Sequence, residues 1–158
     1  MRHAKIKKRV TNPDTLYNSV IIAKLINYIM IDGKKTVAQE QVYKALKNLA
    51  EKGKSDALQL FDKAIQNVGP KVEVKARRIG GANYQVPIEV RPERKISLAL
   101  RWIIESARKR SNKEYHSFAE KLAAELLDAV NNQGEAIRKK EVAMKQAEAN
   151  KAFSTFRW

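Results

Sequence analysis

Two adjacent arginines, Arg77 and Arg78, are the residues best suited to chemistry in this chain. A guanidinium group presents a planar fork of N–H donors that matches the oxygens of phosphate. Successive residues of a β-strand point to opposite faces, so a strand carrying this pair is cationic on both faces. Such a strand is unsuited to a protein core and suited to phosphate. The pair therefore predicts binding of a polyanion.

The other basic residues are also concentrated. The chain of 158 residues has 32 Lys and Arg against 17 Asp and Glu, which gives a net charge of +15 and a pI near 10.1. Residues 1–10 carry five bases and no acid, and residues 71–110 carry eleven bases and four acids. A strongly basic balance favours nucleic acid first and an anionic membrane second. Charge gathered in this way predicts a binding surface.

The candidate nucleic-acid contacts are basic or aromatic and fall in five parts of the chain. They are Arg2, Lys5, Lys7, Lys8 and Arg9; Lys34 and Lys35; Lys75, Arg77, Arg78, Tyr84 and Arg91; Arg94, Arg101, Trp102, Arg108 and Arg110; and Arg157 and Trp158. Lysine and arginine neutralise phosphates, and aromatic rings stack on unpaired bases.

Several of these residues also have a purely structural explanation. Charges such as Lys75 protect an edge strand from aggregation. The stripe Arg94, Arg101 and Arg108 can be a solvated helix face, with Glu105 paired to Arg101. Trp102 is also explained as half-buried core. These alternatives stay open at the level of sequence.

Signals for catalysis are missing. The chain has no cysteine, which excludes disulfides, thiolate metal sites and thiol catalysis. The histidines, His3 and His116, are isolated, and the carboxylates Glu120, Glu125 and Asp128 are expected on a solvated helix face. No cofactor, metal or small-molecule substrate is expected, and the chain is predicted not to be an enzyme.

The fold predicted by the spacing of apolar residues is mainly α, with six helices and one protruding two-stranded antiparallel hairpin between helices 3 and 4. The expected helices cover residues 18–31, 36–53, 55–69, 92–110, 115–131 and 135–151. Thr36 and Gln39 have the spacing of a capping box, and Ser55 is expected to cap the third helix. The first helix, apolar around most of its circumference, is expected at the centre. The sixth is expected to be polar, with Ile137, Ala143, Met144 and Ala147 as its apolar contacts.

One domain is expected, at residues 13–158, after a flexible basic tail at 1–12. The arm, residues 71–91, alternates in period two on both sides of a turn at residues 80–83. A lone hairpin is marginal in water, so the arm must lean on the helices or on a partner. Its tip is expected to be functional, and its base, near Val72 and Val90, to pack on helices. Residues 152–158 form an aromatic and basic tail. The apolar run from residue 20 to 31 is too short to cross a bilayer, no secretory signal is expected, and the absence of cysteine suits a reducing cytosol.

Nearly the whole chain after the tail resembles the bacterial form of the small-subunit ribosomal protein seven family. The resemblance rests on residues 30–35 (MIDGKK), 72–75 (VEVK), 77–78, 80–81, 84–87 (YQVP), 89–92 (EVRP), 101–102, 107–108 with Arg110, 147–153 (AEANKAF) and 157–158. It implies a helical bundle with a protruding hairpin. It also implies direct binding to the 3′ major (head) domain of small-subunit rRNA, organisation of head assembly, and a cytoplasmic location in the ribosome.

The family resemblance further implies a place near the exit-site tRNA and the mRNA path, with protein eleven as a neighbour, and a capacity to repress its own messenger. Two rival functions remain open on the residues alone. An architectural DNA-bending protein also combines a helical body with a basic two-stranded arm. An RNA-modifying enzyme is disfavoured because no nucleophile, acid–base pair or cofactor loop is found.

Overall fold

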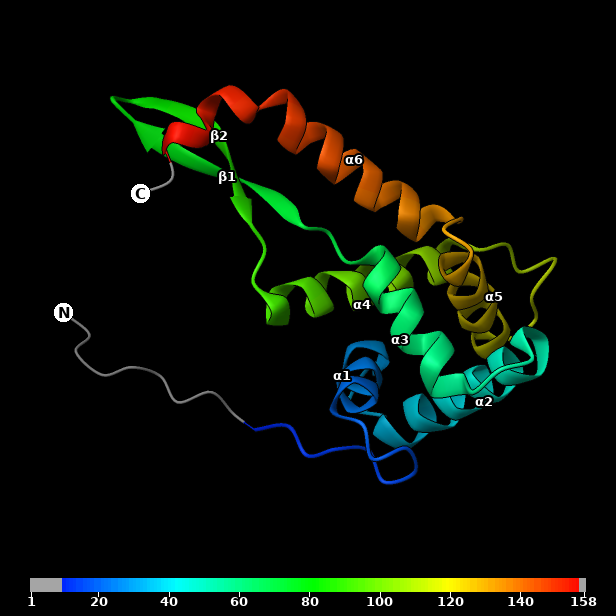
Figure 1. Cartoon of the computed structure of the whole chain (residues 1–158). Helices are drawn as coiled ribbons and strands as arrows, with labels where there is room; N and C mark the ends of the chain where they lie inside the picture. Colours follow the sequence, from blue (N-terminus) through cyan, green and yellow to red (C-terminus); the bar gives the residue numbers. More distant parts are fainter. Residues whose placement is uncertain (1–9, 157–158) are drawn as a thin grey trace.

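The computed structural model describes residues 10–156, a helical body from which one hairpin protrudes (Figure 1). The elements are α1 (Val20–Ile29), α2 (Lys35–Gly53), α3 (Ala57–Val68), β1 (Val72–Ile79), β2 (Ala82–Glu89), α4 (Pro92–Lys109), α5 (Phe118–Val130), α6 (Glu135–Ala149) and the short 3₁₀ helix η1 (Lys151–Phe156). The predicted fold class is confirmed. Within residues 10–156, no helix combines the length and the apolar character needed to span a membrane.

Helix α5 is the centre of the body. It packs against α2, α3, α4 and α6, and its Leu122 and Leu126 are fully buried. Helix α1 packs only against α2 and α4 among the helices, and Val20 is 41% exposed. The expectation that the first helix is central was therefore wrong. Small residues explain the difference, because the alanines of α5 let four neighbouring helices approach it closely.

Two of the helix caps predicted from the sequence are not formed. Helix α2 begins one residue before Thr36, and neither α2 nor α3 has a side-chain cap. A variant of the capping box lies instead at α5, where the Glu120 N–H donates to Ser117 Oγ and the N–H of His116, the residue before the cap, donates to Glu120 Oε2. The bond from the His116 N–H is the main reason that the pKa of Glu120 is lowered.

The hairpin is regular up to its turn. β1 and β2 pair antiparallel, from Val72 opposite Glu89 to Ile79 opposite Ala82. The two turn residues, Gly80 and Gly81, have φ of +56° and +89°, which suits the tight turn of a two-residue loop. The turn is therefore shorter than residues 80–83, because Ala82 and Asn83 already belong to β2.

The C-terminal part of the chain covers the arm. Helix α6 runs from the end of α5 to the hairpin, and η1 lies against β2 (Figure 1). The ring of Tyr84 lies 5.3 Å from that of Phe153 and 5.5 Å from that of Phe156, centroid to centroid. Val86 on the same strand is completely buried. The cover thus extends beyond the base of the arm, to which packing had been expected to be confined.

Helix α6 has fewer apolar contacts than expected. Its buried residues are Ala136, Ile137 and Ala147, whereas Met144 is 41% exposed and does not join the core. The terminal tail is not extended through residue 156, since residues 151–156 form η1. Phe153 and Phe156 are three residues apart, and a 3₁₀ helix brings such residues onto one side.

A partly buried ionic cluster joins the end of α4 to α5 and α6. Arg110 Nε donates to Glu125 Oε2 at 2.8 Å, and a second guanidinium nitrogen of Arg110 bonds Asp128. Glu125 Oε1 accepts the backbone N–H of Ala136 in the first turn of α6. Glu125 is only 1% exposed, so the expectation that it lies on a solvated face was wrong. We call Arg110, Glu125 and Asp128 the Arg110 cluster.

The charge of Arg110 is stabilised within this cluster. Burial opposes the charged form, but the hydrogen bonds to Asp128 and Glu125 outweigh it, so the pKa of Arg110 is raised. Lys121 adds a bond at 2.7 Å to the backbone oxygen of Arg110. The cluster fixes the start of α6 relative to α5.

Replacement of Glu125 by Gln is predicted to lower the free energy of unfolding by about 3 kcal/mol, because it removes one charge of a buried pair. Urea denaturation at neutral pH measures the change. The control is Glu141→Gln on the exposed side of α6, expected to change stability by less than about 0.5 kcal/mol. Equal stability of the two variants would contradict a structural role for the buried carboxylate.

Candidate nucleic-acid interface

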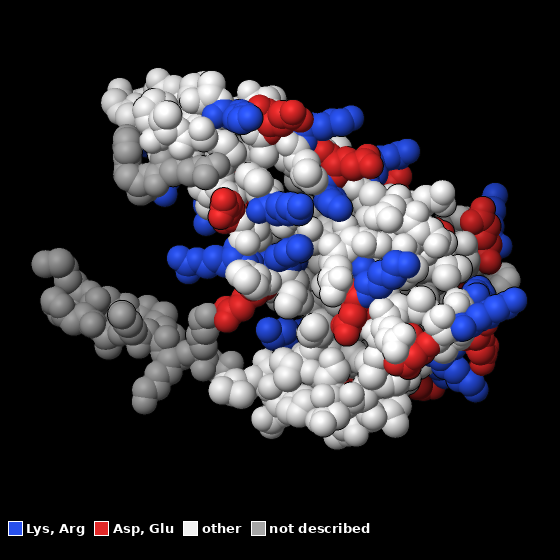
Figure 2. Space-filling view, in the orientation of Figure 1, with Lys and Arg blue, Asp and Glu red and all other residues white. Residues whose placement is uncertain are grey.

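A basic groove of about 700 Å³ lies at the base of the arm. Its lining residues come from both strands and from the start of α4; they are Glu73, Lys75, Arg77, Ile88, Glu89, Arg91 and Arg94. Lysine and arginine side chains gather over this region, beside a hollow between the arm and the body (Figure 2). Four of the predicted contact residues are thus brought to one place from positions up to 19 apart in the sequence.

Acidic residues in the groove offset only part of its charge. Glu73 pairs with Arg94 at 3.3 Å and with Lys75 at 3.8 Å. Both cations are about half exposed, and such ion pairs contribute little free energy. Four cations face two carboxylates in this lining. The lining therefore carries a net positive charge, which favours an anionic ligand.

The arginines of α4 face different neighbours. The Arg101 guanidinium lies over the ring of Tyr28, 5.4 Å from its centroid, while an Arg108 nitrogen donates to the backbone oxygen of Ile29 at 3.3 Å. Glu105 pairs with Lys139 of α6, so the alternative pairing with Arg101 was wrong. Arg94, Arg101 and Arg108 are all exposed and follow α4 from the arm toward the end of α1.

A second basic position lies where α1 ends and α2 begins. Lys34 and Lys35 are exposed there, and Lys34 lines the same pocket as Arg108. The turn before them depends on Asp32 and Gly33, which have φ of +52° and +73°. The loop thus places Lys34 beside Arg108, in the last turn of α4. Arg78 is exposed near the end of the arm.

Three further candidates, Arg110, Trp102 and Tyr84, are less exposed and contact other parts of the protein. Arg110 is held in the Arg110 cluster and lies 5.6 Å from the ring centroid of Tyr115. Trp102 is half-buried against the core, in accord with its structural explanation. Tyr84 packs on Phe153 and Phe156. Their side chains support the surface, and Arg110 points into the body rather than to solvent.

Seven candidates, at residues 1–9 and 157–158, lie outside the described residues: Arg2, Lys5, Lys7, Lys8, Arg9, Arg157 and Trp158. Tyr28 and Phe153, in contrast, were missed at the level of sequence. The Arg101 guanidinium lies over the ring of Tyr28, and the ring of Phe153 packs against Tyr84 of the arm. The spacing of Phe153 and Phe156 was the available signal for the second contact.

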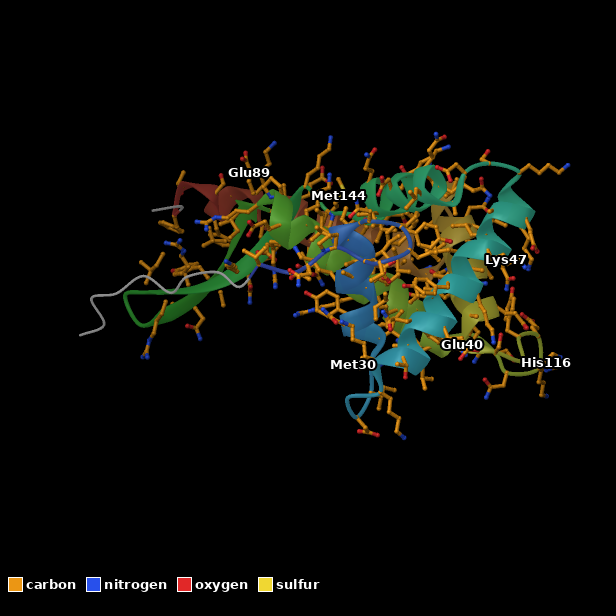
Figure 3. The ribbon with its side chains drawn as sticks, turned by 90° about the horizontal axis from the view of Figure 1, so that it is seen from below. Met30, Glu40, Lys47, Glu89, His116 and Met144 are labelled. Atoms are coloured by element: carbon orange, nitrogen blue, oxygen red, sulfur yellow. The ribbon has the colours of Figure 1, made fainter. Side chains whose placement is uncertain are left out.

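The described part of the chain offers no group of three or more metal-ligating side chains. His116 is exposed and lies at the end of the body away from the arm (Figure 3). The geometry therefore concentrates cations rather than reactive groups. It suits binding of a folded polyanion.

Comparison with known proteins agrees with this chemistry. The family model described as "Ribosomal protein S7p/S5e" matches residues 1–151. Proteins named "Small ribosomal subunit protein uS7" from Acidithiobacillus ferrooxidans and Thermosipho africanus are each 54% identical to the chain, over 99% and 100% of both sequences. One from Clostridium botulinum is 55% identical over 99% of both. The chain therefore belongs to the S7p/S5e family, as a structural, non-enzymatic and rRNA-binding constituent of the small ribosomal subunit.

Proposed function

We propose that the protein binds directly to the 3′ major (head) domain of small-subunit rRNA and organises the assembly of the head. The observation that carries the proposal is the position of the arm. It stands beside the cationic face of α4, so Arg77, Arg91 and Arg94 border one groove. Two walls at an angle fit a junction of RNA helices better than a single straight duplex.

Binding rests on phosphate neutralisation and on shape. Lysine and arginine displace counterions from the RNA, which makes affinity fall steeply with salt. The deep, narrow major groove of A-form RNA does not admit a recognition helix, so the surface reads the path of the backbone and the unpaired nucleotides. A preformed hollow with cations on both sides suits that mode.

The end of the arm extends toward the exit-site tRNA and the mRNA path. Eight-residue strands reach roughly 26 Å at about 3.3 Å per residue, far enough to leave the rRNA surface. Arg78 and the turn glycines are exposed at that end. Small-subunit protein eleven is the proposed protein neighbour. These positions follow from the resemblance to the family together with the exposure of the arm.

The same surface provides a route to self-repression. A messenger that folds into a junction resembling the head-domain site presents the same arrangement of phosphates. We propose that the protein binds such a segment of its own messenger when rRNA is scarce. Competition between the two RNAs for one surface is the expected behaviour.

Reversing Arg77 and Arg78 to Glu is predicted to weaken binding to a head-domain rRNA transcript by well over tenfold, because it replaces attraction to phosphate by repulsion. Filter binding over a series of salt concentrations measures the affinity and the salt slope, which is the steepness with which the logarithm of the affinity falls with the logarithm of the salt concentration. The matched control is Lys47→Glu/Lys54→Glu, at exposed positions in α2 and directly after it, which makes the same change in net charge. Equal losses in both variants, or equal wild-type affinity for unrelated DNA duplexes, would contradict the proposal.

Arg108 and Arg110 are predicted to respond differently to replacement by Gln. Arg108→Gln removes an exposed cation, so the salt slope falls by about 0.7–0.9 while stability changes little. Arg110→Gln leaves the buried Glu125 without its partner. The free energy of unfolding therefore falls by about 3 kcal/mol or more, and the salt slope is unchanged. Urea denaturation and filter binding measure the two properties. A reduced salt slope with unchanged stability for Arg110→Gln would contradict this assignment and indicate that Arg110 contacts RNA.

A further inference from the structure

An apolar pocket of about 410 Å³ opens where α1 ends and α2 begins. Its walls come from four helices and the loop after α1; the lining residues are Ile29, Ile31, Lys34, Val37, Ala38, Gln41, Arg108 and Phe118. Met30, next to this lining, marks the region in Figure 3, at the end of α1. The volume lies within the range of about 300–1,000 Å³ that is usual for sites of small ligands.

Two exposed aliphatic side chains form part of the walls. Ile31 is 60% exposed and Val37 is 53% exposed, and both face the pocket that they line. A single exposed aliphatic residue is ordinary, but two that border one cavity form a local apolar surface. Such a surface favours a ligand that brings apolar area to it.

The two charged residues that line the pocket are both basic. Lys34 and Arg108 line it, and no acidic residue does. Arg108 is held there by its bond to the backbone oxygen of Ile29. A ligand that fits has an apolar, compact body and an attached anionic group. An RNA nucleotide with an unstacked base has both, because the two faces of the base are apolar and its phosphate is anionic.

Two other grooves fit a nucleotide less well. The groove at the arm contains the carboxylates of Glu73 and Glu89. In the groove beside Trp102, Arg138 pairs with Glu135 and Lys139 pairs with Glu105. The pocket at α1 and α2 is also next to Lys35, which was predicted from the sequence as a nucleic-acid contact. Continuity with that predicted contact favours RNA over a protein side chain as the occupant.

We propose that this pocket binds one unpaired nucleotide of small-subunit rRNA, with its base between Ile31 and Val37 and its phosphate on Lys34 and Arg108. The inference rests on the proposed binding to head-domain rRNA. It adds a position at which the protein reads a nucleotide that has left its helix, in addition to the backbone. Sequence-specific recognition of RNA generally uses such unstacked bases.

The test is Ile31→Ser/Val37→Ser, which removes apolar walls without changing charge. Both side chains are more than half exposed, so the core is retained. The control is Leu16→Ser/Val142→Ser, two similarly exposed aliphatic residues outside this pocket. For a transcript of the 3′ major domain, the pocket variant is expected to bind roughly tenfold more weakly with an unchanged salt slope, whereas Lys34→Gln lowers the slope by about 0.7–0.9.

Chemical probing of the same transcript gives a readout that does not depend on the variants. Wild-type protein is expected to change the base reactivity of at least one unpaired nucleotide, and the pocket variant to leave that nucleotide as in free RNA. Absence of such a nucleotide, or equal affinity of the pocket and control variants, would overturn the inference. If wild-type protein shows no preference for this transcript over another rRNA domain, the proposed function itself fails.

Discussion

A two-stranded hairpin alone is only marginally stable in water and has no fixed orientation, because each strand has one unpaired edge and only one ladder of hydrogen bonds is formed. The contact of Tyr84 with Phe153 and Phe156 supplies the missing support. Aromatic pairs of this kind contribute about 0.5–1.5 kcal/mol each beyond the area that they bury. The contact joins the last residues of the described chain to the middle of β2. The angle between the arm and α4, and with it the basic groove, depends on it.

The support is itself anchored in the body. Glu125 bonds both Arg110 and the first turn of α6, so a buried carboxylate determines where α6 starts. Helix α6 then carries Phe153 to the arm. A buried ion pair is weak evidence for stability but a strong constraint on geometry when one partner also caps a helix. In a ribosomal constituent, which works in the bacterial cytoplasm, this arrangement presents a shaped cationic surface to rRNA.

Much of this could be predicted from the sequence, since period-two alternation around Gly80 and Gly81 identifies the hairpin and apolar spacing identifies the helices. Which helix is central could not be predicted from the sequence. Helix α5 takes that place because its alanines let neighbouring helices approach, and such small side chains carry no strong hydrophobic signal. Capping-box spacing occurs both at Thr36 and at Ser117, and only the second is used. The role of Arg110 depends on residues 15 and 18 positions away, and charge counting treats it like Arg108. Tertiary pairing decides which arginines remain for RNA.

The most direct test measures whether the arm has one orientation before RNA binds. The chain has no cysteine, so spin labels can be attached to cysteines introduced at Arg78 and Lys47 alone. The distance distribution between them in the free protein is predicted to have one narrow peak. Replacing Phe153 and Phe156 by Ala is predicted to broaden it, while leaving the helical body folded. A broad distribution in the otherwise unaltered chain, or one that the two replacements do not change, would contradict the account.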